Sequence, residues 1–182
     1  MELSWKRDEA LVWDEDKQRV IGGQPEGVFA FSHPLGTSLT GDWWSVADPD
    51  GNVLGYGWLD STWGGDAEVL LAVAPEAQTA GVGSFILDHL EDEASRRGMN
   101  YVYNTLQEAH PKRSELFDWL VVRGYVGSES GGPVRKRVVS GADDGPKAPP
   151  PARHTADPTL DHAFPPGHEE SGGYVDPEDH QY

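Results

Sequence analysis

A glutamine and two glycines stand immediately before an amphipathic segment of the chain, in the stretch AQTAGVGSFILDHLEDEASRRG, residues 77–98. Glycines at the start of a helix let backbone N–H groups turn toward an anion such as a pyrophosphate, at the positive end of the helix dipole. The spacing Gln78-x-x-Gly81-x-Gly83 lacks the third glycine of a dinucleotide fingerprint and the Gly-Lys-Ser/Thr of a P-loop. The sequence therefore predicts an anion-binding loop of another kind.

Predicted strands and helices alternate around this loop. The nearly continuous apolar run Ala67–Ala74, which Pro75 ends, is typical of a central strand that is covered on both faces. Apolar side chains recur on one stripe from Gly83 to Arg97, and this period predicts a helix that stops at Gly98. A second helix is predicted over residues 110–124, and further strands over residues 43–48, 53–60, 100–106, 125–128 and 133–139.

The first forty residues are compatible with two different structures. The run ALVWDEDKQRVIGG, residues 10–23, fits a hairpin that turns at Glu15–Lys17, and it also fits a helix over Asp8–Arg19. Another strand is predicted over residues 27–31. Trp43 and Trp44 are neighbours in a strand and must point to opposite faces, so we expect one in the core and the other near a cleft. Most of seven aromatic residues are expected in the core: Trp13, Phe29, Phe31, Trp43, Trp44, Trp58 and Trp63.

Charge and composition exclude several classes of function. The 182 residues include 31 acidic and 14 basic side chains, a formal net charge of −17. Nucleic acids are bound by clustered Lys and Arg, so no nucleic-acid partner is expected. The acidic charge of the domain has two alternative explanations: it attracts a cationic substrate, or it only keeps the protein soluble. Because cysteine is absent, disulfides, thiolate zinc sites and cysteine nucleophiles are excluded. The charged N-terminus is unlike a signal peptide and no apolar run approaches membrane-spanning length, so a cytoplasmic protein with no membrane partner is expected.

The composition changes after Ser140. Residues 141–182 hold eight of the 14 prolines and four of the seven histidines, with few apolar side chains. They cannot bury enough surface to offset the entropy of ordering, so the sequence predicts a domain over residues 1–140 and a disordered acidic tail over residues 141–182. The tail histidines match no metal-ligand spacing, and no metal is predicted. The acidic and aromatic end of the tail is either a peptide that binds a protein partner or only a solvating segment.

The order of these elements resembles the acyl-CoA-binding core of the GNAT superfamily of N-acetyltransferases. The matching pieces are AEVLLAVAPEAQTAGVGSFILDHLEDEASRRGMNYVY and a later helix that ends in RGY, and the resemblance covers residues 43–139. It implies an α/β (α+β) fold with a mixed, largely antiparallel sheet, a splayed central strand pair and flanking helices.

The resemblance also implies where acetyl-CoA, the expected cosubstrate, lies. Pantetheine would enter the gap between the strand at 67–74 and the strand at 100–106, and would pair with the free strand edge. The loop would cradle the pyrophosphate through its backbone amides. The residues carried over from the family are Leu71, Ala72 and Val73 on the strand edge, and Gln78, Thr79, Ala80, Gly81, Val82, Gly83 and Ser84 in the loop.

The family transfers an acetyl group directly from acetyl-CoA to a primary amine, which must lose a proton before it attacks. Glu68, at the start of the central strand, stands where some members place the base carboxylate. Asp60 and Asp66 are alternative bases, and a strand-edge acid in water is the structural alternative for Glu68. The amine itself, on a small molecule or a peptide, is not encoded in any motif.

Two positions depart from the family pattern. Leu120 stands where many members carry a tyrosine that protonates the leaving thiolate, and HPKR stands where an asparagine is common. The expected replacements for the acid are Tyr103, Tyr101 and His110, unless the thiolate leaves without assistance. A third possibility is a catalytically weak acyl-CoA-binding module whose acidic tail recruits a protein partner.

Overall fold

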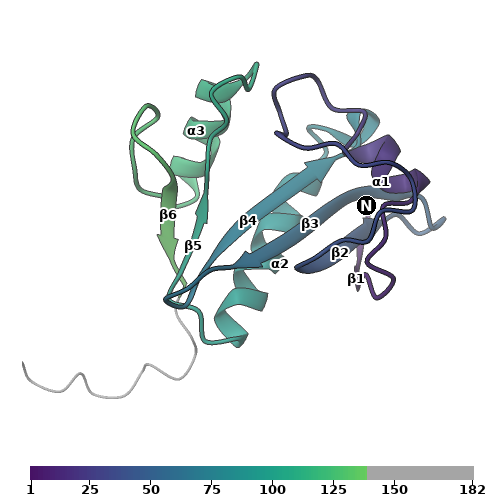
Figure 1. Ribbon diagram of the computed structural model, residues 1–182, viewed down its shortest axis with the longest axis horizontal. Coiled ribbons are helices and arrows are strands. Elements are labelled where there is room, and N and C mark those ends of the chain that lie inside the picture. The colour runs from purple at the N-terminus through teal and green to yellow at the C-terminus, as the bar shows by residue number, and fades with distance from the viewer. Residues whose placement is uncertain (139–182) are drawn as a thin grey trace, which may run out of the picture. The chain divides into compact units, whose positions relative to one another are not determined.

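Six strands form one sheet in the order β1-β2-β3-β4-β5-β6, in a computed structural model that describes residues 1–138 (Figure 1). Every neighbouring pair is antiparallel except β4 and β5, which are parallel. This mixed, largely antiparallel sheet confirms the predicted fold class. The strands are β1 (Ser4–Arg7), β2 (Asp42–Ala47), β3 (Val53–Ser61), β4 (Asp66–Val73), β5 (Tyr101–Asn104) and β6 (Val134–Arg137).

The two central strands separate soon after they meet. β4 and β5 pair only at Asp66–Tyr101, Ala67–Val102 and Glu68–Tyr103. The next group on the β4 edge, the carbonyl of Val69, accepts a hydrogen bond of 2.9 Å from the side-chain amide of Asn104 instead of from a backbone N–H. Figure 1 shows the strands diverging from this end, with α3 (Arg113–Val122) on the side of β5. The splayed pair implied by the sequence is therefore present.

One face of the sheet is covered by α2 (Val82–Arg96), which lies behind the strands in Figure 1. Two glycines of β3 allow this close packing. A Cβ atom on Gly57 would lie 2.5 Å from Cγ2 of Ile86, and one on Gly55 would lie 2.8 Å from Cδ1 of the same residue. Both distances are shorter than real Cβ contacts, so α2 can approach β3 only because these side chains are missing.

The opposite face carries the short helix α1 (Glu15–Val20), whose first turn is capped by Asp14 accepting from the backbone N–H of Lys17 at 2.8 Å. Lys17 is fully buried, and its ammonium lies 2.5 Å from the carboxylate of Asp8 and 3.1 Å from that of Asp14. The same ammonium lies 4.9 Å from the centroid of the Tyr56 ring. A buried charge persists only when it is paired in this way.

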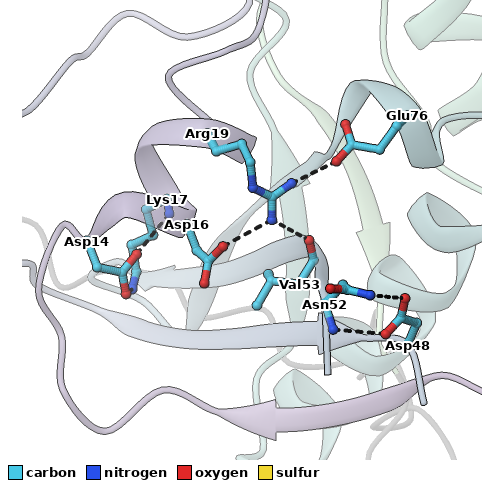
Figure 2. Close-up of polar contacts among 8 residues, drawn as sticks. All are labelled: Asp14, Asp16, Lys17, Arg19, Asp48, Asn52, Val53 and Glu76. Carbon is cyan, nitrogen blue, oxygen red and sulfur yellow. Dashed lines mark hydrogen bonds and ion pairs between the residues drawn. The ribbon is translucent and has the colours of Figure 1, made fainter. Parts of the chain in front are cut away.

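A second basic residue of α1 ties the helix to two other segments (Figure 2). The guanidinium of Arg19 donates to Glu76 at 2.7 Å, to the carbonyl of Val53 at 2.7 Å and to Asp16 at 3.0 Å. Glu76 belongs to the 3₁₀ turn η1 (Pro75–Ala77), which directly precedes the glycine loop. Arg19 therefore holds α1, the start of β3 and the approach to the loop together.

Aromatic stacking fills both faces of the sheet. The rings of Trp43 and Trp58 stack at 4.3 Å on one face, and those of Trp5 and Trp44 stack at 5.6 Å on the other. The opposite directions of Trp43 and Trp44 are as predicted, but both are buried, so neither is a free cleft residue. Trp63, in the turn between β3 and β4, is fully exposed and is an exception to the expected aromatic core.

Three predicted elements differ in the structure. The hairpin at residues 10–23 is wrong, because Asp14 caps a helix there, and α1 is shorter than the alternative helix over Asp8–Arg19. The strand at residues 27–31 is also wrong, since this segment forms turns and bends. The strand at residues 125–128 is reduced to one bridge between Val126 and Arg135, because a glycine-containing turn follows immediately.

The predicted tail, residues 141–182, and the boundary at residue 140 lie outside the described residues. Within residues 1–138, no helix is long and apolar enough to cross a membrane. Within the same residues, no three His, Asp or Glu side chains are grouped so that they could hold a metal ion.

Candidate functional site

The divergence of β4 and β5 opens a cleft of about 580 Å³. Its walls come from β4, the end of β5, α3 and the loop before β2. Of the residues predicted for function, the lining includes Glu68, Asp60, Leu71, Ala72, Val73, Gln78 and His110. Tyr103 and the loop residues 79–84 are not among the lining residues.

The β4 edge that faces the cleft offers backbone hydrogen-bonding groups without a strand partner. Alternate residues of a strand direct these groups to opposite edges, and Val69 directs its carbonyl toward β5, so Leu71 and Val73 face the same way. Ala72 directs its backbone groups to β3, where it is paired with Tyr56. The edge carbonyl of Val73 accepts a hydrogen bond of 2.8 Å from the side-chain amide of Gln24, a contact that the sequence did not reveal.

The glycine loop leads into the N-terminus of α2. Thr79 and Gly81 both have left-handed backbone angles, with φ of 67° and 83°, which turn the chain sharply before the helix. No side chain caps α2, and the N–H groups of Val82, Gly83 and Ser84 belong to its first turn, where no helical carbonyl precedes them. The positive end of a 15-residue helix and these donors suit an anion.

A cation that sequence reasoning missed stands beside this helix start. Arg123 follows the last residue of α3, and its guanidinium lies 3.9 Å from the centroid of the Trp119 ring. It also donates to the hydroxyl of Ser84 and, at 3.2 Å, to the carbonyl of Trp119. The RGY sequence contains this arginine, but only the fold brings the end of α3 next to the start of α2.

Three polar side chains lie side by side on three neighbouring strands, and two of them, Asp60 and Glu68, line the cleft. Glu68 of β4 is paired with Asp60 of β3 on one side and with Tyr103 of β5 on the other, so all three project from the same face of the sheet. Desolvation raises the pKa of Asp60 above its ordinary value. Burial, and next the charge of Glu68, raise the pKa of Tyr103, so its hydroxyl stays protonated.

The remaining acid and base candidates are separated by the fold. His110 lines the cleft, accepts the backbone N–H of Lys112 on Nδ1 at 3.0 Å, and has a pKa lowered by burial. Asp66 is paired with Arg135 at 2.9 Å, and the same guanidinium lies over the Tyr101 ring, so both residues are engaged away from the cleft. Leu120 is buried in the cleft wall and offers no proton.

The cleft lies between splayed parallel strands, and Gln78, from the glycine loop that precedes α2, is among its lining residues. Residues 9–118 match the model of the acetyltransferase (GNAT) family. Since this match spans more than half of the chain, the protein belongs to that family. No curated protein matches the chain.

Solved structures share the same fold at low sequence identity. A protein from Desulfovibrio desulfuricans assigned to the GNAT family is 13% identical with a TM-score of 0.54, and the match covers 76% of this chain and 100% of that one. The N-acetylglutamate synthase from Neisseria gonorrhoeae, crystallised with coenzyme A and N-acetyl-glutamate, is 16% identical with a TM-score of 0.56. That match covers 76% of this chain but only 35% of the synthase.

Proposed function

We propose that this protein transfers an acetyl group from acetyl-CoA directly to a primary amine. The observation that carries the proposal is the cleft itself. Its β4 edge lacks a strand partner beyond Val69, and Glu68 lies in the same cleft. Membership of the GNAT family supports the reaction class.

The residues around the cleft fit an acyl-CoA. Leu71 and the N–H of Val73, whose carbonyl already accepts from Gln24, would pair with the amides of pantetheine, and the first-turn N–H groups of α2 would hold the pyrophosphate. The guanidinium of Arg123, beside Ser84, adds a positive charge for the same phosphates. When bound, acetyl-CoA supplies an acetyl thioester, which is activated for attack by a nucleophile.

Gly83 provides a test of this fit that is independent of charge. A Cβ atom on Gly83 would lie 3.6 Å from Val73, 3.8 Å from Trp119 and 3.9 Å from Leu71, all in ordinary van der Waals contact. A larger side chain would extend into the space between β4 and α3. The missing side chain of Gly83 therefore leaves the route from the loop to the β4 edge open.

Glu68 is the proposed base. An amine reaches the cleft mostly as an ammonium ion, and it must transfer one proton to a carboxylate, directly or through water, before its nitrogen can attack. Asp60, the cross-strand neighbour of Glu68, provides a second negative charge that holds the ammonium. Asp66 is the weaker alternative, since its carboxylate is bound to Arg135.

Two of these residues can assist the leaving sulfur. His110 lines the cleft, and because its Nδ1 accepts from Lys112, its Nε2–H can donate a hydrogen bond to the sulfur but not the proton itself, since a neutral imidazole that lost it would become an imidazolate. Tyr103 stays protonated beside Glu68. A thiol has a much lower pKa than an amine, so the thiolate can also leave without an acid and be protonated by water.

Release of free thiol from acetyl-CoA, measured with a panel of amines, tests the proposal. Glu68→Gln should lower kcat by about 100-fold, the usual effect of losing a general base, while acetyl-CoA still raises the melting temperature. Glu9→Gln, an exposed carboxylate outside the cleft, is the matched control and should leave kcat unchanged. Near-normal turnover of Glu68→Gln from pH 6 to pH 9 would exclude the role of Glu68.

Leu120 favours a second candidate function, because an apolar side chain stands in the wall where the family commonly has an acid. In this alternative the domain binds acyl-CoA without efficient transfer, and residues 141–182 recruit a protein partner. The thiol-release assay separates the two: the alternative predicts a thermal shift with acetyl-CoA and no thiol release with any amine.

A further inference from the structure

The part of the cleft away from the glycine loop has an aromatic wall. Phe29 and Phe31 from the loop before β2 join Trp58 of β3, and all three line the cleft. The ring centroids lie 5.4 Å apart for Phe29–Phe31, 5.7 Å for Phe29–Trp58 and 6.0 Å for Phe31–Trp58. Leu70 of β4 is paired with Trp58 and extends this wall, and Leu116 of α3 also lines the cleft. Trp58 itself is only 2% exposed, so Phe29 and Phe31 in front of it offer the contact area, which suits an apolar or aromatic body rather than a polar one.

Negative charge is concentrated at one end of this wall. Asp60 and Glu68 are directly paired across β3 and β4. Gly41 makes room for the Asp60 carboxylate, because a Cβ atom on Gly41 would lie 2.6 Å from its Oδ1. Among the described residues that line the cleft, Lys112 is the only one with a permanently charged basic side chain, and it lies 3.9 Å from Glu115 on α3. An ammonium ion is therefore matched near Asp60, whereas a carboxylate there would meet like charges.

The loop that carries the aromatic residues is anchored on both sides of the opening. Gln24 donates to the carbonyl of Val20 at 2.7 Å and to that of Val73, at the end of β4, at 2.8 Å. Gly27, with φ of 90°, packs so closely on the β5–α3 loop that a Cβ atom would lie 2.1 Å from the carbonyl oxygen of Ala109. The loop thus contacts the last residue of β4 and the segment that follows β5, and it encloses this part of the cleft on that side.

We infer that the acceptor is a small monoamine with an aromatic body and no carboxylate next to the amine, an arylalkylamine in chemical terms. The inference rests on the proposed acetyl transfer and names its substrate class. The aromatic body packs on Phe29 and Phe31, with the buried ring of Trp58 behind them, and the ammonium lies between Asp60 and Glu68. An α-amino acid with the same body brings a carboxylate toward these two acids, and a polyamine brings a second ammonium onto the apolar wall.

Three amines that differ in one feature each provide the test. 2-Phenylethylamine and phenylalanine share a body and differ by the carboxylate, and spermidine has the charges without the aromatic ring. Their kcat/KM values are measured by thiol release from acetyl-CoA, and their affinities by calorimetry with the full chain in the presence of coenzyme A. We expect 2-phenylethylamine to exceed both other amines by roughly tenfold or more in each measurement, as like-charge repulsion and lost aromatic contact require.

Two variants locate the preference in these side chains. Asp60→Asn should weaken the binding of 2-phenylethylamine. It should also reduce the ratio of the 2-phenylethylamine affinity to the phenylalanine affinity, because it removes one of the two negative charges that repel the carboxylate of phenylalanine. Phe29→Leu should reduce the ratio of the 2-phenylethylamine affinity to the spermidine affinity. It should leave the ratio of 2-phenylethylamine to phenylalanine unchanged, since both of these amines carry the aromatic ring. Circular dichroism of each variant checks that the fold is retained.

The outcomes distinguish this inference from the proposed function. Equal or tighter binding of phenylalanine or spermidine overturns the inference, even if acetyl transfer is rapid. Failure of 2-phenylethylamine to bind also overturns it. Thiol release that fails with all amines, together with a retained calorimetric preference for 2-phenylethylamine, overturns the proposed transfer and supports the binding preference.

Discussion

Substitutions of Gly83 separate the stability of α2 from access to the cleft. Gly83 lies in the first turn of a helix with an ordinary negative φ, and a methyl group there meets Val73, Trp119 and Leu71 at 3.6 to 3.9 Å. Alanine should therefore be tolerated without strain. Because glycine loses more backbone entropy on folding than alanine, Gly83→Ala should stabilise the free protein by about 0.5–1 kcal/mol. For a domain of this size, that raises Tm by roughly 1–4 °C.

Gly83→Phe should have a different effect on ligand binding. Its ring extends past the methyl position into the space between β4 and α3, where the cosubstrate is expected. At a ligand concentration of 100 Kd, acetyl-CoA stabilises the wild-type protein by about 2.7 kcal/mol. If the ring lowers the affinity 100-fold, the same concentration stabilises the variant by only about 0.4 kcal/mol. The thermal shift with acetyl-CoA should therefore almost disappear.

Differential scanning fluorimetry with and without acetyl-CoA measures both effects. Asp92→Ala is the matched control, because it raises helix propensity at an exposed position of α2 and should keep the full acetyl-CoA shift. A Gly83→Phe protein that keeps the wild-type shift would refute the assignment of this space to the cosubstrate. A loss of Tm in Gly83→Ala would refute the conclusion that a methyl group fits at this position in ordinary van der Waals contact.

Three further predictions concern stability and the extent of the domain. Lys17→Met should destabilise the fold by about 3–5 kcal/mol in urea titrations, because it leaves the mostly buried carboxylate of Asp8 without its ammonium partner. The control Arg96→Met removes only the surface ion pair with Glu93 and should change the free energy of unfolding by less than about 1 kcal/mol. A hydrogen bond from Arg97 holds the pKa of Asp42 below the ordinary value. The Asp42 carboxylate therefore stabilises the fold above about pH 4, and this stabilisation is lost as the pH falls through the lowered pKa. Asp42→Asn should be less stable than wild type at pH 7, and the difference in stability should shrink between about pH 5 and pH 2. Truncation after Ser140, the proposed domain boundary, should leave Tm and acetyl-CoA binding nearly unchanged, and a truncated protein that unfolds would move that boundary into residues 141–182.

The helices and strands that could be predicted are those that a local pattern of residues specifies. The apolar run of β4, the stripe of α2 and the glycines after each long helix are local signals, and the structure confirms all of them. The prediction of a strand at residues 27–31 is wrong because the alternating aromatic residues of this segment resemble a strand. Its aromatic side chains instead pack on Trp58 and on one another, and Gly27 allows a contact with Ala109 that no local pattern encodes.

The candidate site shows the same division. Glu68 is chosen through the family resemblance and the loop from Gln78 to Gly83 through its glycines before a helix, and their roles stay predictions. Arg123 and Gln24 could not be chosen, because each reaches the site through a contact between segments that are far apart in the sequence. The pairing of Asp60 with Glu68 likewise depends on the register of β3 and β4, which the turn between them determines.

The short ladder between β4 and β5 has a consequence for the cooperativity of the fold. Three residue pairs join β1–β4 to β5–β6, and α2 packs under both parts of the sheet. Amide protons on the two sides can therefore exchange as separate units, with the lowest protection near the divergence. A ligand that pairs with the β4 edge while contacting α3 would fill the missing part of the ladder. Ligand binding would then couple the two exchange units, and the domain would unfold as one body only when the cleft is occupied.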